Sequence, residues 1–351
     1  MSGSSLFEYL EAHWRQPKPW LSLFLRPVSH LFRVLSARHR RQYASGRLQV
    51  GKLPVPVVVV GNIHVGGTGK TPVTAALANA LSERGVQVGI ISRGYGRKSR
   101  EVHVLHKNST AAEAGDEPLL LYRKTGVPVA VGKERAAAGR ALLSAFPQTE
   151  LLLSDDGLQH YALARDLEII VFPYADYFRS DLNLLPDGPL REPSERLLEA
   201  DALVYSACPQ DFVPDRENSF ASFVKTGVLY RLNRPSEKAV AADFAAQKTA
   251  ALAAIARPQR FFDSLADLGF DLAECRVLPD HASLSADNLP AADAVFITEK
   301  DAVKLMPSAR TENVWVLPVC AIIRPDLADF VLSRLQESSG KPGGTSFKRA
   351  A

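Results

Sequence analysis

A glycine-rich segment between a strand and a helix constrains the fold of this chain more than any other feature. Residues 55–60 form a short apolar run, mostly valine, which is typical of a buried strand. Residues 61–71 read Gly-Asn-Ile-His-Val-Gly-Gly-Thr-Gly-Lys-Thr, and residues 72–84 have a helical pattern. This order predicts a phosphate-binding loop (P-loop) in an α/β fold, with a mostly parallel sheet and helices on both faces.

The chemistry expected of this loop depends on its backbone and on two side chains. Glycines let successive N–H groups point at phosphates, and the helix N-terminus adds partial positive charge. Lys70 is expected to reach the β- and γ-phosphates, and the Thr71 hydroxyl is expected to bind Mg²⁺. The predicted nucleotide-binding residues are Gly66, Gly67, Thr68, Gly69, Lys70, Thr71 and Pro72.

The loop departs from the strict motif at His64, where the usual pattern has glycine. A glycine-rich turn that carries an unrelated lysine is the alternative interpretation. Gly66, Gly67 and Gly69 still provide the conformational freedom, which favours the P-loop. Val65 occupies the position at which partition-type ATPases carry an additional lysine, and this argues against that group.

Two adjacent carboxylates follow a second apolar run. Residues 150–160 read Glu-Leu-Leu-Leu-Ser-Asp-Asp-Gly-Leu-Gln-His, which places Asp155 and Asp156 at the end of a predicted strand. In a parallel sheet that end lies beside the phosphate loop. Adjacent aspartates are costly to ionise together unless a cation compensates, so we expect them to support Mg²⁺. An ordinary Asp-Asp-Gly turn is the alternative.

Two further segments of the first half contain candidate residues. Asp116 and Glu117 precede a helical pattern at 119–123, where a helix cap and a first-turn acid are the simplest interpretation. An aspartate near a γ-phosphate is also the residue type that accepts a proton from an acceptor hydroxyl. Arg93 and Tyr95 belong to a basic loop with two glycines, which either faces anions or is simply solvated.

The second half predicts another α/β unit without a second P-loop. Strand patterns occur at 202–205, 228–232, 249–255, 294–297 and 314–319, and helical patterns occur at 258–268 and 327–336. The proline-rich segment 184–193 is interpreted as the junction. We therefore predict a helical N-terminal segment at 1–42, a nucleotide-binding domain at 43–195, a smaller acceptor-binding domain at 196–338 and a polar, disordered tail at 339–351.

The N-terminal segment has the pattern of an amphipathic helix that lies in a membrane surface. Residues 1–50 contain eight Lys or Arg but only two acidic residues, and Trp14 and Trp20 precede an apolar stripe. Pro27 is expected to kink or divide the helix. No apolar run reaches the length of a transmembrane helix. A helix packed on the core of the protein is the alternative. The stripe consists of Leu21, Phe24, Leu25, Val28, Phe32 and Leu35.

Composition excludes some classes of function. The net charge of +4 is too small to indicate nucleic-acid binding. Cys208, Cys275 and Cys320 are widely spaced, so they match neither a metal site nor a disulfide framework. A reducing cytoplasm is the expected compartment.

Taken together, the motifs resemble the tetraacyldisaccharide 4'-kinase family over residues 10–335. The resemblance rests on seven phrases in the same order. They are residues 61–72, Ser-Arg-Gly-Tyr-Gly at 92–96, Gly-Asp-Glu-Pro at 115–118, Ser-Asp-Asp-Gly-Leu-Gln-His at 154–160, the proline-rich junction at 184–193, Pro-Asp-His at 279–281 and Thr-Glu-Lys-Asp-Ala at 298–302. The chain departs from the family pattern at His64, at Asp187 and over 174–182.

The resemblance implies an enzyme that uses ATP and Mg²⁺ to phosphorylate the 4'-hydroxyl of a tetraacyldisaccharide 1-phosphate, a lipid A precursor. It implies attachment to the anionic cytoplasmic face of the bacterial inner membrane, and we expect a monomer. It suggests Asp116 as the base, with His281 brought to it from the second domain by closure, and Lys70 as a further catalytic residue. The expected metal ligands are Thr71, Asp155, Asp156 and Glu117, and the expected substrate-binding residues are Gln159, His160, Arg93, Tyr95 and Arg191.

Two other functions remain open at the level of sequence. A membrane-recruited P-loop ATPase that acts as a switch would explain the basic helix and the loop, but it would not need Asp116 or His281. A soluble small-molecule kinase would leave the N-terminal stripe as ordinary core packing.

Overall fold

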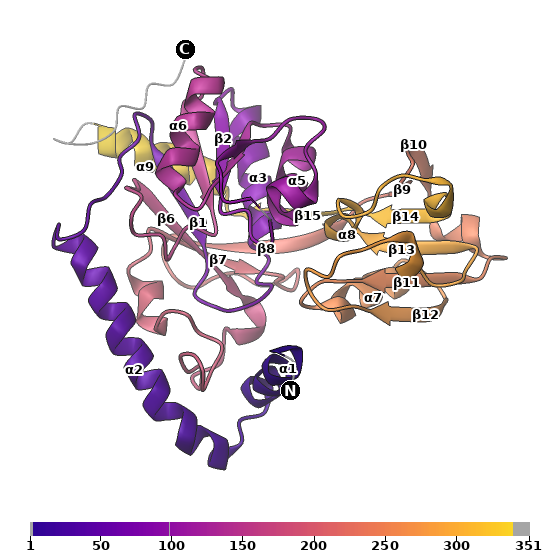
Figure 1. Ribbon diagram of the computed structural model, residues 1–351, viewed down its shortest axis with the longest axis horizontal. Coiled ribbons are helices and arrows are strands. Elements are labelled where there is room, and N and C mark those ends of the chain that lie inside the picture. Colours follow the sequence, from indigo (N-terminus) through magenta and orange to yellow (C-terminus); the bar gives the residue numbers. More distant parts are fainter. Residues whose placement is uncertain (1–2, 98, 340–351) are drawn as a thin grey trace. The chain divides into compact units, whose positions relative to one another are not determined.

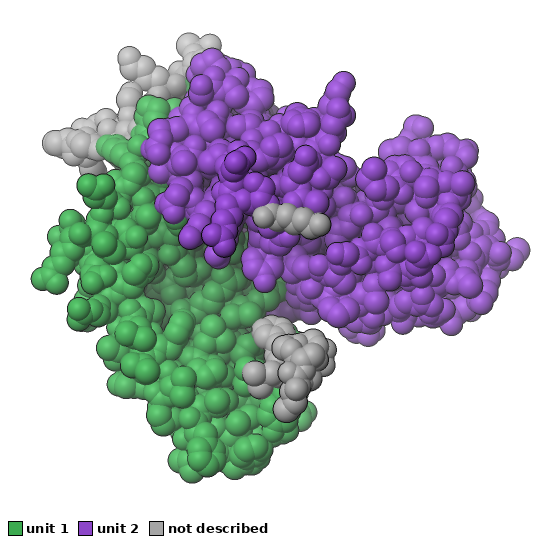
Figure 2. Space-filling model, viewed as in Figure 1, with its two compact units in different colours: residues 1–70, 150–222, 323–351 green, residues 71–149, 223–322 purple. Residues whose placement is uncertain are grey.

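The computed structural model describes residues 3–97 and 99–339, which form two compact units. Unit 1 contains residues 1–70, 150–222 and 323–351, and unit 2 contains residues 71–149 and 223–322 (Figure 2). The domain boundaries expected from the sequence stay a prediction. The tail expected at 339–351 lies, apart from Ser339, outside the described residues.

Five parallel strands form the sheet of unit 1, in the order β8-β7-β6-β1-β5 (Figure 1). Apolar residues fill both faces of these strands, as expected for a parallel sheet covered on both sides. The strands predicted at 55–60 and 202–205 are confirmed. The bounds are β1 (Val57–Gly61), β5 (Leu151–Asp155), β6 (Leu167–Pro173), β7 (Ala202–Ser206) and β8 (Ser219–Thr226), with α9 (Leu327–Ser339) and the short helices η1 (Tyr174–Asp176) and η2 (Ser194–Leu198).

The N-terminal segment of unit 1 forms two helices, α1 (Gly3–Arg15) and α2 (Pro19–Ala44). Helix α2 continues through Pro27, so it is not divided there (Figure 1). Pro27 is exposed, and the Leu23 side chain one turn earlier is 71% exposed. The carbonyl that loses its helical partner at a proline can therefore be hydrated, which makes the proline tolerable.

The buried face of α2 is polar rather than apolar. Ser22 and Ser29 are buried, and the Ser29 hydroxyl donates to the Leu184 carbonyl at 3.0 Å. Phe24 and Val28 of the predicted stripe are exposed. The other exposed apolar residues of α2 are Trp20, Leu23, Leu31, Val34 and Leu35. Among the described residues, no helix combines the length and hydropathy of a membrane-crossing segment.

Asp187, one of the departures from the family pattern, connects the N-terminal helices to the rest of unit 1. Its carboxylate contacts His13 Nε2 at 3.1 Å, and its N–H donates to the Ser29 hydroxyl at 3.1 Å. The neighbouring Pro186 carbonyl accepts a hydrogen bond from the Trp14 indole at 2.9 Å. His13, Trp14 and Asp187 are all buried.

The first part of unit 2 continues the chain after the glycine-rich loop. Strands β2 and β4 are parallel, and β3 pairs with β4 in the antiparallel direction. The helix expected after the loop is confirmed as α3. The bounds are α3 (Lys70–Glu83), β2 (Val88–Ser92), β3 (His103–Val104), α4 (Ala111–Ala114), α5 (Asp116–Thr125), β4 (Val129–Val131) and α6 (Arg135–Ala145).

The second part of unit 2 contains a six-stranded sheet in the order β10-β9-β14-β13-β11-β12 (Figure 1). Strands β14, β13, β11 and β12 are parallel, and β9 and β10 are antiparallel. Its core contains Phe244, Phe270, Phe296 and Trp315. The bounds are β9 (Leu229–Arg231), β10 (Arg234–Ala239), β11 (Thr249–Ala253), α7 (Pro258–Asp267), β12 (Leu272–Val277), β13 (Ala294–Thr298), α8 (Glu299–Ala302) and β14 (Val314–Leu317), with η3 (Ala241–Phe244), η4 (Ala286–Asn288) and η5 (Ala309–Thr311). Strand β15 (Val319–Arg324) follows β14 in the chain but is not part of this sheet.

Candidate active site

The glycine-rich loop begins where β1 ends and finishes where α3 begins. Gly66 and Gly69 have φ angles of 90° and 83°, a region in which only glycine is unstrained. A Cβ at Gly61 would lie 2.6 Å from the Leu158 Cβ, so the loop also requires glycine there for space. The glycines of the loop, the strand before it and the helix N-terminus after it are therefore those that a phosphate-binding loop needs.

Side chains inside the loop hold its shape. The Asn62 amide lies 2.7 Å from the Thr68 hydroxyl, and both residues are buried. His64 turns away from solvent: its Nε2 lies 3.3 Å from an Asp176 carboxylate oxygen, and its ring meets the Phe172 ring edge-on at 4.9 Å. His64 thus holds the loop to the body of unit 1. This explains how the chain accommodates histidine at a position that usually has a small residue.

The predicted metal carboxylates lie beside the loop lysine. Asp155 is buried at the end of β5, and β1 and β5 pair so that Val60 is opposite Asp155. Asp156 has a φ of 48°, and Lys70 Nζ lies 3.3 Å from its Oδ1. Arg191 Nη1 lies 3.5 Å from Asp156 Oδ2. Two cations therefore approach one carboxylate at the carboxyl edge of the sheet.

Gln159 connects this carboxylate pair to the loop. Its side-chain amide donates to the Asn62 carbonyl at 3.0 Å and to Glu192 at 2.7 Å. Arg191 Nη1 lies 3.4 Å from the Gln159 side-chain oxygen. The structure therefore brings together Lys70, Asp156, Gln159 and Arg191, which the sequence assigned to three different roles.

A second cluster lies in unit 2 and is centred on Asp116. His281 Nδ1 lies 2.9 Å from one Asp116 carboxylate oxygen and 3.2 Å from the other. Lys300 Nζ lies 3.0 Å from Glu117, 3.1 Å from Asp280 and 4.0 Å from Asp116. Asp116 is buried at the start of α5, and His281 has a φ of 61°, an uncommon conformation for histidine.

The ionisable groups of this cluster shift one another's pKa values. Burial alone would raise the pKa of Asp116, but the His281 hydrogen bond and the Lys300 charge outweigh it and hold that pKa below its usual range. The Asp116 hydrogen bond raises the pKa of His281, against burial and the Lys300 charge. Burial lowers the pKa of Lys300, but the charges of Glu117, Asp280 and Asp116 raise it more. The resting cluster favours an ionised Asp116 and a charged Lys300.

The structure also gives the positions of the remaining predicted residues. The Tyr95 ring lies 5.1 Å from the His281 ring, edge-on, and Arg93 is exposed just after β2. Thr71 lies in the first turn of α3, and Glu117 accepts a hydrogen bond from Lys300. The backbone carbonyl of His160 accepts from Arg165 at 2.6 Å.

Sequence reasoning missed the contributions of Lys300 and Glu192. Lys300 lies in the charged segment 299–302, which follows β13. Its position just after a strand, where functional residues are common, was the available signal. Glu192 lies in the proline-rich junction, and nothing in its local pattern indicates that it contacts Gln159.

The residues present fit a nucleotide with Mg²⁺. No group of three or more His, Cys, Asp or Glu side chains within residues 3–97 and 99–339 is arranged to hold a metal by itself. Mg²⁺ differs from other metals in this respect, because it is commonly held by one or two carboxylates together with substrate phosphates and water. The glycine-rich loop, Lys70 and the Asp155–Asp156 pair provide that combination.

The fold and these residues define a P-loop protein of the α/β class that binds nucleotide phosphates. Comparison with known proteins is more specific: the family described as tetraacyldisaccharide-1-P 4'-kinase matches residues 21–336. The chain belongs to this family, as its motifs predicted.

Curated relatives and a solved structure agree with this assignment. The tetraacyldisaccharide 4'-kinase of Neisseria gonorrhoeae is 58% identical over 93% of this chain and 95% of the relative. That of Chromobacterium violaceum is 47% identical over 95% of this chain and 99% of the relative. The crystal structure of the "apo" form of LpxK from Aquifex aeolicus, in complex with ATP, has a TM-score of 0.77 and 30% sequence identity, covering 90% of this chain and 99% of that one.

Proposed function

We propose that this chain transfers the γ-phosphate of ATP to the 4'-hydroxyl of a tetraacyldisaccharide 1-phosphate, a lipid A precursor. The observation that carries the proposal is the contact between Asp116 and His281 in a chain that also has a glycine-rich phosphate loop. An ATPase switch needs a loop and a metal site, but it has no use for a carboxylate–imidazole pair that accepts a proton from an alcohol. The switch is therefore not favoured.

Bound MgATP supplies the phosphoryl group and the metal charge that neutralises the phosphates. The loop amides and Lys70 would hold the phosphates, and Thr71, Asp155, Asp156 and Glu117 are the residues that would hold the metal. Asp116 takes the proton of the 4'-hydroxyl as the new O–P bond forms and the bond to the β-phosphate oxygen breaks. His281 fixes the direction of the Asp116 carboxylate and shares the proton afterwards.

The acceptor is anionic, which accounts for the cations and polar side chains assigned to it. Arg191 and Gln159 lie beside Asp156 in unit 1, and Arg93 and Tyr95 lie in the loop after β2 in unit 2. Arginine suits a phosphorylated sugar because its planar donors pair with phosphate oxygens in two places at once. His160 completes the set of residues proposed for acceptor binding.

Helix α2 is proposed to hold the enzyme at the cytoplasmic face of the bacterial inner membrane, as a monomer. Its exposed apolar residues include Phe24, which is 69% exposed, and Leu31, which is 57% exposed. A groove of about 620 Å³ on α2 and the following turn is lined by Arg33, Arg38, Arg41 and Arg47, among others. Apolar side chains next to arginines match the boundary between acyl chains and anionic headgroups.

The proposed reaction is tested by transfer of radiolabelled γ-phosphate from ATP to purified tetraacyldisaccharide 1-phosphate in detergent micelles. We expect labelled lipid with the parent chain and almost none with the Lys70→Ala variant. Protein that hydrolyses ATP at a rate indifferent to the lipid, without labelling it, would overturn the proposal in favour of the ATPase switch.

The membrane proposal has a separate test. Flotation with vesicles that contain anionic lipid should recover the parent chain, and Phe24→Asp with Leu31→Asp should reduce the recovery at least severalfold. Equal recovery of both proteins would show that α2 is not the contact with the membrane.

A further inference from the structure

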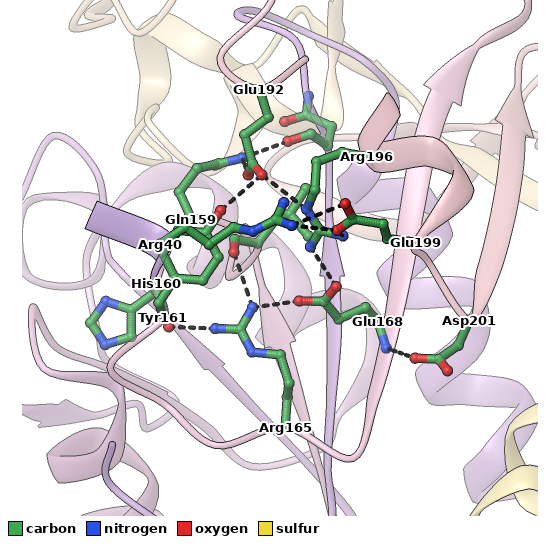
Figure 3. A network of polar contacts seen from close by, with 12 residues as sticks. Arg40, Gln159, His160, Tyr161, Arg165, Glu168, Glu192, Arg196, Glu199 and Asp201 are labelled. Carbon is green, nitrogen blue, oxygen red and sulfur yellow. Dashed lines mark hydrogen bonds and ion pairs between the residues drawn. The ribbon is translucent and has the colours of Figure 1, made fainter. Parts of the chain in front are cut away.

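A buried ion-pair network in unit 1 ends on a residue proposed for acceptor binding (Figure 3). At its centre is Arg196 of η2, whose side chain is only 4% exposed. Its guanidinium donates to Glu168, to Glu192 at 3.0 Å and to Glu199 at 3.2 Å. Burial lowers the pKa of Arg196, but the carboxylates of Glu168 and Glu192 raise it more, so the arginine stays charged.

Glu192 is the member of the network that faces the loop after β5. Its side chain is 5% exposed, and both of its oxygens have partners besides Arg196. One accepts from the Gln159 amide at 2.7 Å, and the other accepts from the Tyr161 hydroxyl at 2.8 Å. A single carboxylate therefore holds two side chains of the segment 159–161, as Figure 3 shows.

Gln159 carries this constraint to the site. The same amide nitrogen donates to the Asn62 carbonyl of the phosphate loop at 3.0 Å. Its oxygen lies 3.4 Å from Arg191, and Arg191 lies 3.5 Å from Asp156. With the Glu192 carboxylate in place, Gln159 must direct its nitrogen toward Glu192 and Asn62 and its oxygen toward Arg191.

The opposite side of the network reaches helix α2 and the backbone after β5. Arg40 donates to Glu199 at 2.7 and 3.0 Å, and Arg165 pairs with Glu168 at 2.8 Å. Arg165 also donates to the backbone carbonyls of residues 158 and 160. Arg40, Arg165 and Arg196 thus each pair with at least one of the three glutamates.

A network of this kind contributes little to the free energy of unfolding. Buried ion pairs lose most of their attraction to the cost of leaving water, and well-packed apolar side chains are often as stable or more so. Fully paired buried groups do, however, define one orientation of each side chain. We propose that Glu192 and Arg196 are positioning residues that fix Gln159, and through it Arg191, for the anionic lipid acceptor. This inference rests on the proposed kinase function.

The main test compares Glu192→Gln with Glu195→Gln. Glu195 lies in the short helix η2 together with Arg196, but it is exposed and pairs only with Arg33 among the contacts that the described residues show. We expect Glu192→Gln to lower kcat/KM for the lipid acceptor at least about 10-fold, which corresponds to one lost interaction with a charged group. KM for ATP should stay within about twofold. Glu195→Gln should match the parent chain. An equal loss for both substrates would overturn the proposal.

A double-variant cycle tests whether Glu192 acts through Gln159. If it does, Gln159→Ala combined with Glu192→Gln should be no worse than Gln159→Ala alone, because the interaction is already lost. If the two substitutions instead lower kcat/KM for the acceptor by the product of their separate effects, Glu192 acts independently of Gln159 and the proposal fails.

Amide hydrogen exchange separates this inference from the proposed function, since it requires no turnover. Peptides that cover residues 157–163 should exchange about 10-fold faster in Glu192→Gln than in the parent or in Glu195→Gln. Unchanged exchange would overturn the positioning role even if the chain proves to be a kinase. Absence of lipid phosphorylation by the parent chain, with faster exchange in Glu192→Gln, would instead sink the proposed function and leave the network as a positioning device for the loop.

Discussion

The phosphate loop of unit 1 and the Asp116 cluster of unit 2 are built in opposite ways. The loop is one continuous stretch, residues 61–70, and its defining features are backbone conformations at Gly66 and Gly69. The Asp116 cluster joins side chains that are 165 residues apart, and its function depends on the contact of Asp116 with His281. The loop leaves Gly66 with open space around it, whereas Asp116 is buried.

The difference follows from the two chemical tasks. Phosphates present many oxygens, so a row of backbone N–H groups binds them and side chains add charge. Accepting a proton requires one carboxylate in a definite direction, with neighbours that set its proton affinity. The first task can be carried out by local sequence, and the second needs tertiary structure. Variants in the two regions should therefore fail in different ways.

The largest effect is expected in the loop. Lys70→Ala should lower kcat about 10²–10³-fold and should also weaken ATP binding, because the same charge contacts the phosphates in the ground state and the transition state. Lipid phosphorylation and ATP binding by calorimetry measure the two quantities. Unchanged ATP affinity would mean that Lys70 contributes to the transition state alone.

The Asp116 cluster should fail in turnover only. Asp116→Asn keeps the size of the side chain but removes the proton acceptor, and we expect kcat to fall about 10²–10³-fold. ATP affinity should remain within about twofold of the parent, in contrast to Lys70→Ala. Loss of ATP binding together with turnover would make Asp116 a structural residue and would remove the distinction between the two regions.

The sequence predicted the phosphate loop better than the Asp116 cluster, for the same reason that separates the two chemical tasks. The strand at 55–60, the loop and its helix were predicted from local pattern, because each depends on neighbouring residues. The strands β10 (Arg234–Ala239) and β12 (Leu272–Val277) were missed, since both lie at sheet edges and carry the polar residues that edges tolerate.

The side-chain contacts of the site show a similar limit. His281 was named as the partner of Asp116 from the family resemblance rather than from any pattern around it. Lys300 and Glu192 lie in two of the seven family phrases, but neither was assigned a role, because the local pattern does not show which carboxylates or amides they contact. Local rules predict backbone conformation, while pairs that are distant in the sequence need the fold itself or related sequences.

A third prediction concerns the stability of the Asp116 cluster. Lys300→Met should leave Glu117, Asp280 and Asp116 without their shared cation, in a site where the Lys300 side chain is 16% exposed. Removing one member of a buried ion pair costs about 3–5 kcal/mol, and partial exposure lowers the expected loss to about 2–4 kcal/mol of unfolding free energy. Denaturant unfolding measures it.

Lys133→Met is the matched control for that loss. Lys133 is an exposed lysine of the same unit, so its replacement should change stability by less than about 0.5 kcal/mol. If Lys300→Met cost no more than this control, the three carboxylates would not depend on the Lys300 charge, and the Asp116 cluster would resemble the solvated surface instead of a built site.

The smallest effect is a dependence of stability on pH at His281. Contact with Asp116 raises the pKa of His281, whereas burial and Lys300 lower it, and Asp280 adds to the raising. Because the pKa of His281 is higher in the folded state, its contact stabilises the protein fully at pH values below the unfolded-state pKa of about 6.5. This stabilisation is lost as the pH rises through the folded-state pKa. The pKa of Asp116 is lower in the folded state, so its contacts stabilise the protein at pH values above the unfolded-state pKa of about 3.9. This stabilisation is lost as the pH falls through the folded-state pKa.

The two contributions overlap between about pH 4 and 6.5, and this window makes the prediction specific. The Tm difference between the parent chain and His281→Gln should be a few °C in that window, at about 2–4 °C per kcal/mol, and should shrink as pH rises toward 9. His30→Gln removes an exposed histidine of α2 and should show a difference near zero throughout. A difference for His281→Gln that stays constant from pH 5 to 9 would mean that the ring acts by packing alone, so that the contrast between a backbone-built loop and a charge-built cluster would have to be abandoned at its central residue.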